Sequence, residues 1–233
     1  MFSEKFLKAV EMLQKDFALE RSIDEKACVD RDGNPIPWYT YPAIEYLSQF
    51  DYSDKKVFEF GCGYSSPFWA ERAAEVISIE DNPIWFGRWQ SAFGNPNLEI
   101  RLREEGEIYE DAILEDGSLY DVIAIDGKRR AECCRTAVLK LAPGGVIILD
   151  DSDRINTSQE YREAVKVLRN ADLLQVDFYG FCPMNAYTKC TSLFLRRDFA
   201  FRSKYEVQPV NGWGNLWSMN RSRRKKAYKD FVK

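Results

Sequence analysis

The sequence predicts an α/β fold: a seven-stranded, mostly parallel sheet with a terminal antiparallel hairpin and helices on both faces. From residue 56 onward, short apolar runs without polar alternation recur between helical stretches, a pattern typical of parallel strands buried on both faces. A glycine turn at 61–66 follows the first of these runs and leads into a helical stretch. The last two apolar runs follow each other with no helix between them, so these neighbouring strands must be antiparallel.

The first 54 residues are expected to form a helical and aromatic lead-in to the sheet. Apolar side chains recur every three or four positions over residues 2–17, which predicts an amphipathic helix. A turn-rich loop at 30–35 and an aromatic, proline-flanked segment at 35–42 follow. Residues 43–50 are then expected to form a short helix.

One domain is expected over residues 1–233, with the lead-in at 1–54, a core at 55–197 and a C-terminal extension at 198–233. Parallel strands are expected at 57–60, 76–79, 98–102, 121–125 and 146–149. Helices are expected at 67–74, 84–93, 130–141 and 158–171. The antiparallel hairpin is expected at 173–181 and 191–197.

The composition is informative mainly through what it lacks: 233 residues include 33 basic and 37 acidic side chains and no histidine. This absence excludes a Ser-His-Asp or Cys-His catalytic unit, an HExxH zinc site and an imidazole general base. Proton transfer must then rely on carboxylates, lysine, tyrosine or a polarised hydroxyl. Any metal site is expected to use oxygen ligands.

Net charge and cysteine content bear on partners and compartment. A formal charge of −4 gives no general attraction to nucleic acid or to an anionic membrane, so neither partner is expected. Six cysteines without a CxxC pair are expected to be reduced thiols, and no apolar run suits a signal peptide or a bilayer span, so we expect a cytoplasmic protein. Trp213 and Trp217 are expected to pack on the domain or on a second subunit, which leaves a homodimer open. A basic stretch is interpreted as a solvated tail: Arg221, Arg223, Arg224, Lys225, Lys226 and Lys229.

The glycine turn is a candidate ligand site. Gly61 and Gly63 allow close approach to the backbone, and the helix that follows offers unpaired N–H groups. Glu80 ends the next strand, where a carboxylate can accept hydrogen bonds from both hydroxyls of a ribose. Two residues argue against a dinucleotide: Ser66 stands where a third glycine is needed, and Glu59 would repel phosphates but attract a cationic ligand.

Residues 59–65 read Glu-Phe-Gly-Cys-Gly-Tyr-Ser and resemble motif I of class I S-adenosylmethionine-dependent methyltransferases. The terminal antiparallel hairpin is likewise typical of their Rossmann-like fold. The resemblance covers residues 55–197 and implies S-adenosylmethionine as the cofactor. It implies Glu59, Gly61, Gly63 and Ser65 around the methionine part, Glu80 at the ribose and Asp126 beside them, with Glu104 as a weaker candidate near the adenine.

Three acids, which we call the strand-end carboxylates, follow the fourth and fifth expected strands: Asp126, Asp150 and Asp151. The carboxyl ends of parallel strands border the ligand crevice, so we expect these side chains to converge beside the cofactor. Clustered carboxylates repel one another unless they are protonated or bind a cation, and oxygen ligands suit Mg²⁺ or Ca²⁺. The arrangement resembles metal-dependent small-molecule O-methyltransferases, which implies Mg²⁺ as a candidate ion that also holds substrate hydroxyls. The alternative is that Asp150 and Asp151 only form a turn or cap a helix.

The residues after Asp126 depart from that resemblance. The sugar-modifying members continue Asp-Gly-Asp-His, whereas this chain continues Gly127-Lys128-Arg129. Asp126 and Lys128 are the catalytic candidates, with Lys128 as general base if burial or a nearby cation lowers its pKa. Two other interpretations of Lys128 stay open: a surface lysine, or a counter-charge that replaces the metal ion.

Trp38, Tyr39 and Tyr41 lie in the aromatic segment before the first strand and are candidate substrate contacts. Segments at this position of the fold often close over the active site. Aromatic side chains flanked by prolines also pin loops to a core, so packing is the alternative interpretation. Asn185 and Tyr187, in the loop of the hairpin, are further candidate contacts.

The leading hypothesis is an S-adenosylmethionine-dependent methyltransferase that acts on an oxygen of a small hydroxylated molecule, with or without a metal ion. Two alternatives stay open: a nicotinamide-dependent oxidoreductase, and a non-catalytic binding protein with a methyltransferase-like fold. Ser66 and Glu59 argue against the first alternative. The intact cofactor motif argues against the second.

Overall fold

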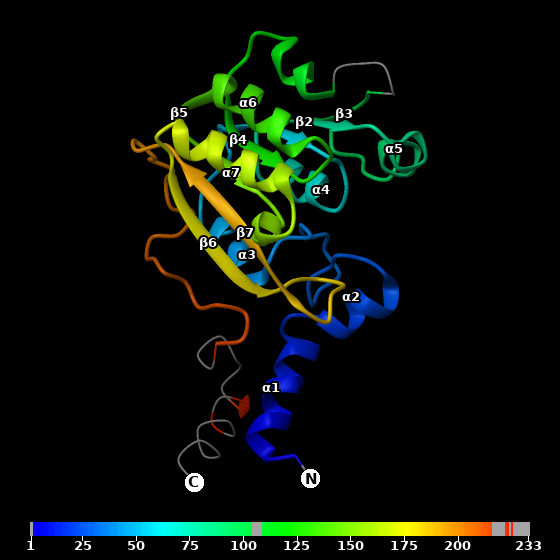
Figure 1. Cartoon of the computed structure of the whole chain (residues 1–233). Helices are drawn as coiled ribbons and strands as arrows, with labels where there is room; N and C mark the ends of the chain where they lie inside the picture. The colour runs from blue at the N-terminus through cyan, green and yellow to red at the C-terminus, as the bar shows by residue number, and fades with distance from the viewer. Residues whose placement is uncertain (1, 104–108, 216–221, 224, 226–233) are drawn as a thin grey trace.

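The computed structural model describes residues 2–103, 109–215, 222, 223 and 225. Within this part of the chain, seven strands form one sheet in the order β3-β2-β1-β4-β5-β7-β6 (Figure 1). Strands β1 to β5 run parallel, and β7 pairs antiparallel with both β5 and β6. The predicted α/β fold with its terminal antiparallel hairpin is confirmed. The strands are β1 (Lys56–Phe60), β2 (Glu75–Glu80), β3 (Leu98–Leu102), β4 (Tyr120–Ile125), β5 (Leu141–Leu149), β6 (Leu174–Phe181) and β7 (Thr188–Leu195).

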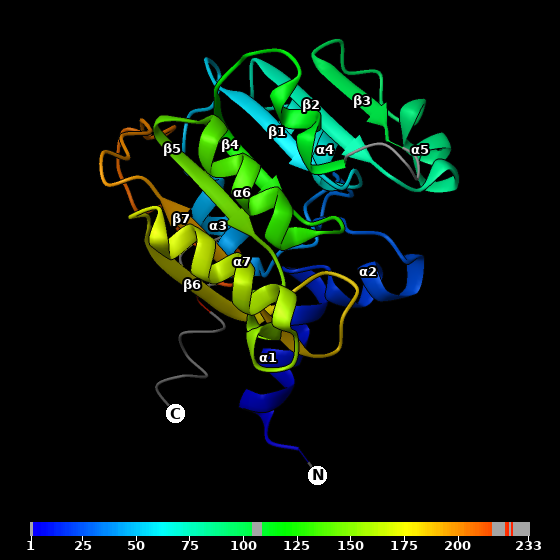
Figure 2. The same ribbon diagram turned by 45° about the horizontal axis from the view of Figure 1, so that its top comes forward.

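Helices cover both faces of the sheet (Figure 2). Successive strand residues point to opposite faces, so Phe58 and Phe60 enter one core and Val57 and Val76 enter another. The first core lies beneath α6 and α7, and the second lies beneath α3 and α4. The helices are α1 (Glu4–Lys15), α2 (Leu19–Glu25), α3 (Tyr41–Leu47), α4 (Ser65–Ala70), α5 (Pro83–Gln90), α6 (Arg130–Lys140) and α7 (Gln159–Asn170), with 3₁₀ turns η1 (Tyr109–Leu114) and η2 (Ser152–Asn156).

Two strands begin three or more residues earlier than the sequence predicts. β5 begins at Leu141 rather than at 146, because Leu141 pairs with Tyr120 before a shift in register. β7 begins at Thr188 rather than at 191, because it stays paired with β6 as far as Phe181. The earlier start of β7 places Lys189 inside the strand.

The expected N-terminal helix forms as α1. Ser3 caps it, because the Ser3 hydroxyl accepts a hydrogen bond from the N–H of Phe6 (3.3 Å). Apolar side chains of α1, among them Phe6 and Val10, are exposed, and Figure 1 shows the helix extending away from the sheet. Among the residues described here, no helix is both long and apolar enough to cross a bilayer.

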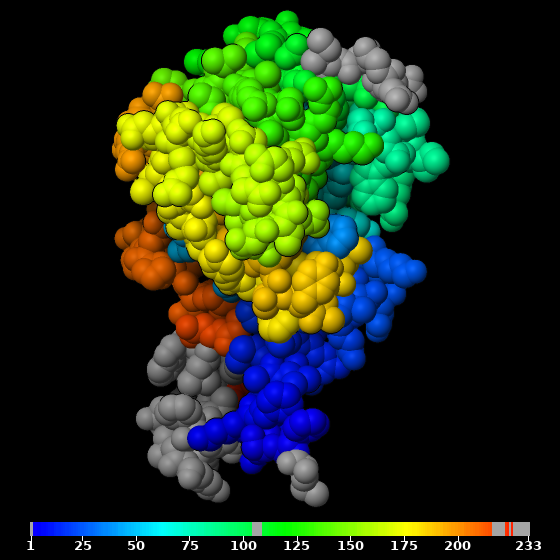
Figure 3. All heavy atoms as spheres, in the orientation of Figure 1, coloured from blue at the N-terminus to red at the C-terminus, as the bar shows by residue number. Residues whose placement is uncertain are grey.

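The C-terminal extension packs against the domain over residues 198–215. The rings of Phe199 and Phe201 stack with their centroids 4.7 Å apart, and both lie edge-on to Phe50. The N–H of Trp213 donates to the Glu45 carboxylate (2.5 Å), which ties the extension to α3. In the space-filling view this segment forms the orange surface on the left of the molecule, above α1 (Figure 3).

The structure describes part of the basic C-terminal stretch. Arg223 forms a bidentate ion pair with Asp16, with N–O distances of 2.7 and 3.0 Å. Lys225 is exposed. Arg223 therefore contributes to the fold instead of lying free in solvent. Other residues named from the sequence lie outside the described part of the chain: Glu104, Trp217, Arg221, Arg224, Lys226 and Lys229.

Candidate functional site

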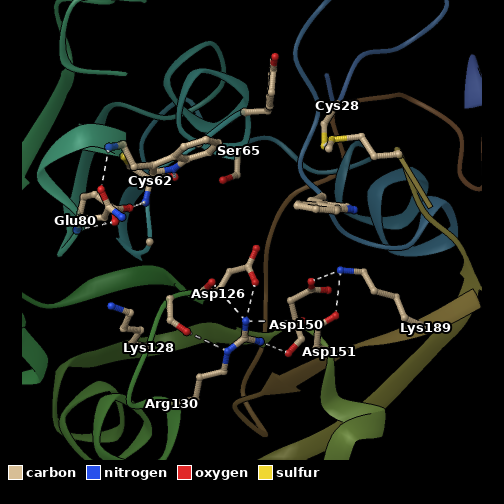
Figure 4. A pocket seen from close by; sticks show the side chains of 18 of the residues that line it. Cys28, Cys62, Ser65, Glu80, Asp126, Lys128, Arg130, Asp150, Asp151 and Lys189 are labelled. Carbon is tan, nitrogen blue, oxygen red and sulfur yellow. Dashed lines mark hydrogen bonds and ion pairs between the residues drawn. The ribbon is translucent and has the colours of Figure 1, made fainter. Parts of the chain in front are cut away.

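A cavity of about 560 Å³ opens at the carboxyl ends of the parallel strands (Figure 4). Open α/β sheets bind their ligands at this edge, and the volume is typical of small-molecule and cofactor sites. Its wall combines the lead-in, the glycine turn, the ends of β2, β4 and β5, and the hairpin. The lining includes Cys28, Trp38, Gly61, Gly63, Ser65, Glu80, Trp85, Asp126, Lys128, Arg130, Asp150, Asp151, Asn185, Tyr187 and Lys189.

The two glycines of the turn have different roles. Gly61 has a φ of +94°, and its N–H donates to the carbonyl oxygen of Ile79 (2.8 Å). A Cβ at Gly61 would lie 2.9 Å from the Cα of Gly127, so the turns after β1 and β4 touch through their backbones. At Gly63 a Cβ would meet no described atom within 4 Å, so the cavity side of this residue is open to a ligand.

Glu59 lies fully buried beneath the turn and does not line the cavity. Its Oε2 accepts hydrogen bonds from the hydroxyls of Ser66 (2.5 Å) and Ser78 (2.7 Å), while its Oε1 has no partner among the described residues. Burial raises the pKa of Glu59 above its ordinary value, against the opposing effect of these hydrogen bonds. The Ser66 hydroxyl also accepts from the N–H of Gly63 (3.1 Å), which explains why a serine stands where a dinucleotide motif has glycine.

Glu80 and Trp85 hold the backbone of Cys62, one at its N–H and the other at its carbonyl oxygen. Oε2 of Glu80 accepts from the N–H of Cys62 (3.2 Å), and the indole N–H of Trp85 donates to the Cys62 carbonyl (2.7 Å). The other oxygen of Glu80 accepts from the N–H groups of Asp81 (3.1 Å) and Asn82 (2.9 Å). Burial raises the pKa of Glu80, and the backbone donors oppose that shift. The carboxylate is thus fixed on the cavity wall before any ligand binds.

Arg130 joins the ends of β4 and β5. Its guanidinium donates to Oδ1 of Asp126 (2.9 Å) and to the carbonyl oxygens of Asp126 (3.2 Å), Gly127 (3.0 Å) and Asp150. The side chain of Asp126 is 24% exposed. Burial raises the pKa of Asp126, and the charge of Arg130 opposes the shift.

Lys189 binds the acids at the end of β5. It donates to Oδ2 of Asp150 and lies 3.1 Å from Oδ1 of Asp151, while Thr191 donates to Oδ1 of Asp150 (2.6 Å). Burial raises the pKa of Asp150, and Lys189 opposes that shift. Burial by itself would lower the pKa of Lys189, but the strand-end carboxylates outweigh it and hold this pKa above its ordinary value. Figure 4 shows the three acids grouped together, with Arg130 and Lys189 reaching them from different sides.

Lys128 lies on the cavity wall with 72% of its side chain exposed and forms an ion pair with Asp81 (2.5 Å). A lowered pKa would require burial or a neighbouring cation. Lys128 is exposed and pairs with a carboxylate, so the burial that would suit a general base is absent. The geometry therefore favours Asp126 over Lys128 as the proton acceptor.

The aromatic lead-in divides between the cavity and the core. Trp38 lines the cavity, and the Nζ of Lys189 lies 5.8 Å from the centre of its ring. Tyr39 and Tyr41 are fully buried and do not line the cavity, which corrects their expected place as substrate contacts. Tyr41 instead packs against Phe17, with centroids 5.0 Å apart. Packing, the alternative interpretation from the sequence, accounts for both tyrosines.

The cavity fits the cofactor that motif I implies. The open side of Gly63 gives room for a ligand against the turn, and the fixed carboxylate of Glu80 can accept hydroxyl hydrogen bonds. The unpartnered oxygen of Glu59 lies beneath the same turn.

The same site does not fit Mg²⁺. Ligand oxygens of the strand-end carboxylates do lie within 4.8 Å of one another, as a metal site requires. However, Arg130 and Lys189 already bind these oxygens, and both cations would repel a divalent ion. The expectation of a metal ion is therefore not supported by the arrangement of charges.

Arg130 and Lys189 were not among the candidates from the sequence. Lys189 is the charged residue of an otherwise uncharged strand, which is a usable signal once the strand is known to begin at Thr188. Arg130 begins α6, directly after the turn that follows β4, and nothing in its local sequence distinguishes it from a surface arginine.

Comparison with protein-family models finds no match, and neither does comparison with curated proteins. Solved structures do match. An O-methyltransferase from Bacillus cereus in complex with SAH shares 17% identity, with 81% of this chain and 97% of that chain covered and a TM-score of 0.55. A putative O-methyltransferase from Klebsiella pneumoniae matches at 17% identity, 76% and 89% coverage and a TM-score of 0.54. The O-methyltransferase TomG from Streptomyces achromogenes, involved in tomaymycin synthesis and solved in complex with SAM, matches at 16% identity, 79% and 89% coverage and a TM-score of 0.53.

The chain has the class I methyltransferase fold. The resemblance noted in the sequence is thus confirmed at the level of the fold. Spermidine synthase from Thermotoga maritima also matches, at 15% identity and a TM-score of 0.50, with 62% of this chain covered. The alignment covers 53% of that enzyme, so the chain spans about half its length. A synthase and several methyltransferases share this fold, so the fold alone does not determine the reaction. The reaction depends on the residues that line the cavity.

Proposed function

We propose that the protein is an S-adenosylmethionine-dependent methyltransferase that transfers a methyl group to an oxygen of a small hydroxylated molecule. One observation carries the proposal: a glycine turn with an open side, a fixed carboxylate and a partly exposed aspartate line one cavity. These are Gly63, Glu80 and Asp126. Together they supply a surface for the cofactor, an acceptor of ribose hydroxyls and a base for the incoming hydroxyl.

The bound cofactor would supply an electrophilic methyl group on a sulfonium. In this proposal Glu80 accepts hydrogen bonds from the ribose hydroxyls, because its oxygens are already oriented by backbone N–H groups. Glu59 places a carboxyl oxygen beneath the turn that has no partner among the described residues. Ser65 lines the cavity and offers a hydroxyl to the same ligand.

Asp126 is the proposed proton acceptor. Its Oδ1 is held by Arg130, and its Oδ2 has no partner among the residues that the structure describes. With the cofactor bound, its sulfonium would give up the methyl group to the acceptor oxygen, and Asp126 would accept the proton that the hydroxyl loses. The products would be a methyl ether, S-adenosylhomocysteine (SAH) and a protonated Asp126, which would return its proton to solvent. The raised pKa of Asp126 makes it a better base than an ordinary aspartate.

Calorimetric titration with SAH tests this function. The wild-type protein is expected to bind SAH in the micromolar range. Glu80→Gln is expected to bind it about 10- to 100-fold more weakly, because it loses charge-assisted hydrogen bonds to the ribose. Glu75→Gln is the matched control, since Glu75 lies at the other end of β2 and pairs with Lys56 at the surface. A wild-type protein that binds NADH and not SAH would contradict the proposal.

A further inference from the structure

The strand-end carboxylates offer the oxygen ligands of a divalent-ion site, but protein cations already occupy it. The ammonium of Lys189 bonds to Oδ2 of Asp150 and lies 3.1 Å from Oδ1 of Asp151. Arg130 and Arg154 contact the same group, so three carboxylates meet three cationic side chains. Lys189 differs from Arg154 because it is buried, with only 7% of its side chain exposed.

We propose that Lys189 is a built-in cation that replaces a divalent metal ion beside the acceptor. The chemical role rests on the proposed function, whereas the replacement of the metal ion rests on the geometry of the charges. In this role the ammonium donates a hydrogen bond to the acceptor oxygen. It stabilises the negative charge that grows on that oxygen while Asp126 takes the proton.

The surroundings of Lys189 leave a donor for a ligand. An ammonium has three N–H groups, and among the described residues that of Lys189 reaches two carboxylates and faces the ring of Trp38. Lys189 and Trp38 both line the cavity, so a ligand lying against the indole can reach the ammonium. A lysine is a point charge that contacts one oxygen, whereas a metal ion can hold two. We therefore expect an acceptor that is held through a single hydroxyl next to a flat apolar surface.

Binding of Mn²⁺ tests the replacement without cofactor or acceptor. Mn²⁺ is titrated into the full chain and followed by electron paramagnetic resonance of the free ion. Removing the ammonium leaves Asp150 without its ion-pair partner and the three carboxylates with one cation fewer, so Lys189→Ala and Lys189→Met are expected to bind Mn²⁺ about tenfold more tightly than the wild type. Lys189→Arg keeps the charge and is expected to behave as the wild type. Lys166→Ala is the matched control, because Lys166 is exposed on α7 outside the cavity.

Two results would overturn the replacement. One is a wild-type protein that itself binds Mn²⁺ at micromolar concentrations and loses the ion in Asp126→Asn. The other is a pair of folded Lys189 variants that bind no more Mn²⁺ than the wild type. The wild-type titration decides the first point even if the variants unfold. SAH is titrated in parallel, so loss of the proposed function is seen separately from the result with Mn²⁺.

Two coloured phenols test whether the acceptor is held through a single hydroxyl. Their binding is measured on the protein in complex with SAH. The wild type is expected to bind 4-nitrophenol and 4-nitrocatechol with affinities within about threefold, because the lysine contacts one oxygen. Lys189→Ala with Mn²⁺ is expected to prefer 4-nitrocatechol by about tenfold, because the ion can hold both of its hydroxyls. A strong preference for the catechol in the wild type would contradict the proposal. So would binding of neither probe by a protein that binds SAH.

Discussion

At the scale of single residues, the two glycines of the turn separate stability from ligand binding. Gly61→Ala is expected to lower the free energy of unfolding by about 2–4 kcal/mol, because it places a side chain at positive φ and presses its Cβ on Gly127. Gly63→Ala is expected to change stability by less than about 1 kcal/mol and to weaken SAH binding, because its Cβ points into open space above the turn. Chemical denaturation and calorimetry on both variants check the pair. Equal loss of stability in the two would contradict it.

Glu59 links the pH dependence of stability to the cofactor site. Burial raises the pKa of Glu59 in the folded protein. Its contribution to the free energy of unfolding is therefore complete below the ordinary pKa of a glutamate and is lost as the pH rises through the pKa of the folded state. Glu59→Gln is expected to gain stability relative to the wild type as the pH rises above the ordinary pKa of a glutamate, because the wild type must then ionise a buried carboxyl group. The same change is expected to weaken SAH binding. Denaturation curves over this pH range, with Glu75→Gln as control, measure the difference; a difference that shrinks with rising pH would show the opposite sign.

The sequence predicted which residues lie at the ends of strands, but it did not predict which side chains are buried. Glu80 and Asp126 follow apolar strands, and the carboxyl edge of a parallel sheet brings such residues to one cavity whatever the register. The burial of Tyr39 depends on tertiary packing, which its local sequence does not encode. Lys189 was not a candidate for a related reason. Its place in β7 depends on how far the two strands of the hairpin stay paired.

At the scale of elements, α5 supports the glycine turn through one indole. Trp85→Phe is expected to cost about 1 kcal/mol of stability and to weaken SAH binding several-fold, because the Cys62 carbonyl loses its donor. Trp89→Phe is the matched control on the same helix, since the indole N–H of Trp89 has no partner among the described residues. Denaturation and calorimetry compare the two variants. Equal weakening of SAH binding in both would mean that α5 acts through packing alone.

Strands and helices with a clear apolar pattern were predicted from the sequence. Elements whose position depends on tertiary packing were not. β3 is found at the predicted residues, Leu98–Leu102. α2 has no counterpart among the predicted elements, because its seven residues are mainly polar and lie between two residues of positive φ, Ala18 and Lys26. Its position follows from the packing of the lead-in, which no short-range pattern shows.

At the scale of the whole molecule, the cavity combines parts from distant stretches of the chain. The glycine turn and the ends of β2 and β4 provide the cofactor side within one continuous stretch of the sheet. The proposed acceptor side adds Trp38 from the lead-in and Lys189 from β7. The strands and the glycine turn were predictable from local patterns, whereas the approach of Lys189 to Trp38 depends on long-range contacts.

The place of β7 also sets an order of assembly. In the part of the chain that the structure describes, β7 is the last strand in sequence, yet it lies inside the sheet, and it is the neighbour through which β6 joins. A growing chain therefore cannot attach β6 to the sheet until residues 188–195 have left the ribosome. Until then Asp150 and Asp151 stand at the end of β5 without their lysine, and the partial domain carries an unbalanced acidic group. Insertion of β7 completes the sheet and brings Lys189 to Asp150 and Asp151 in one step.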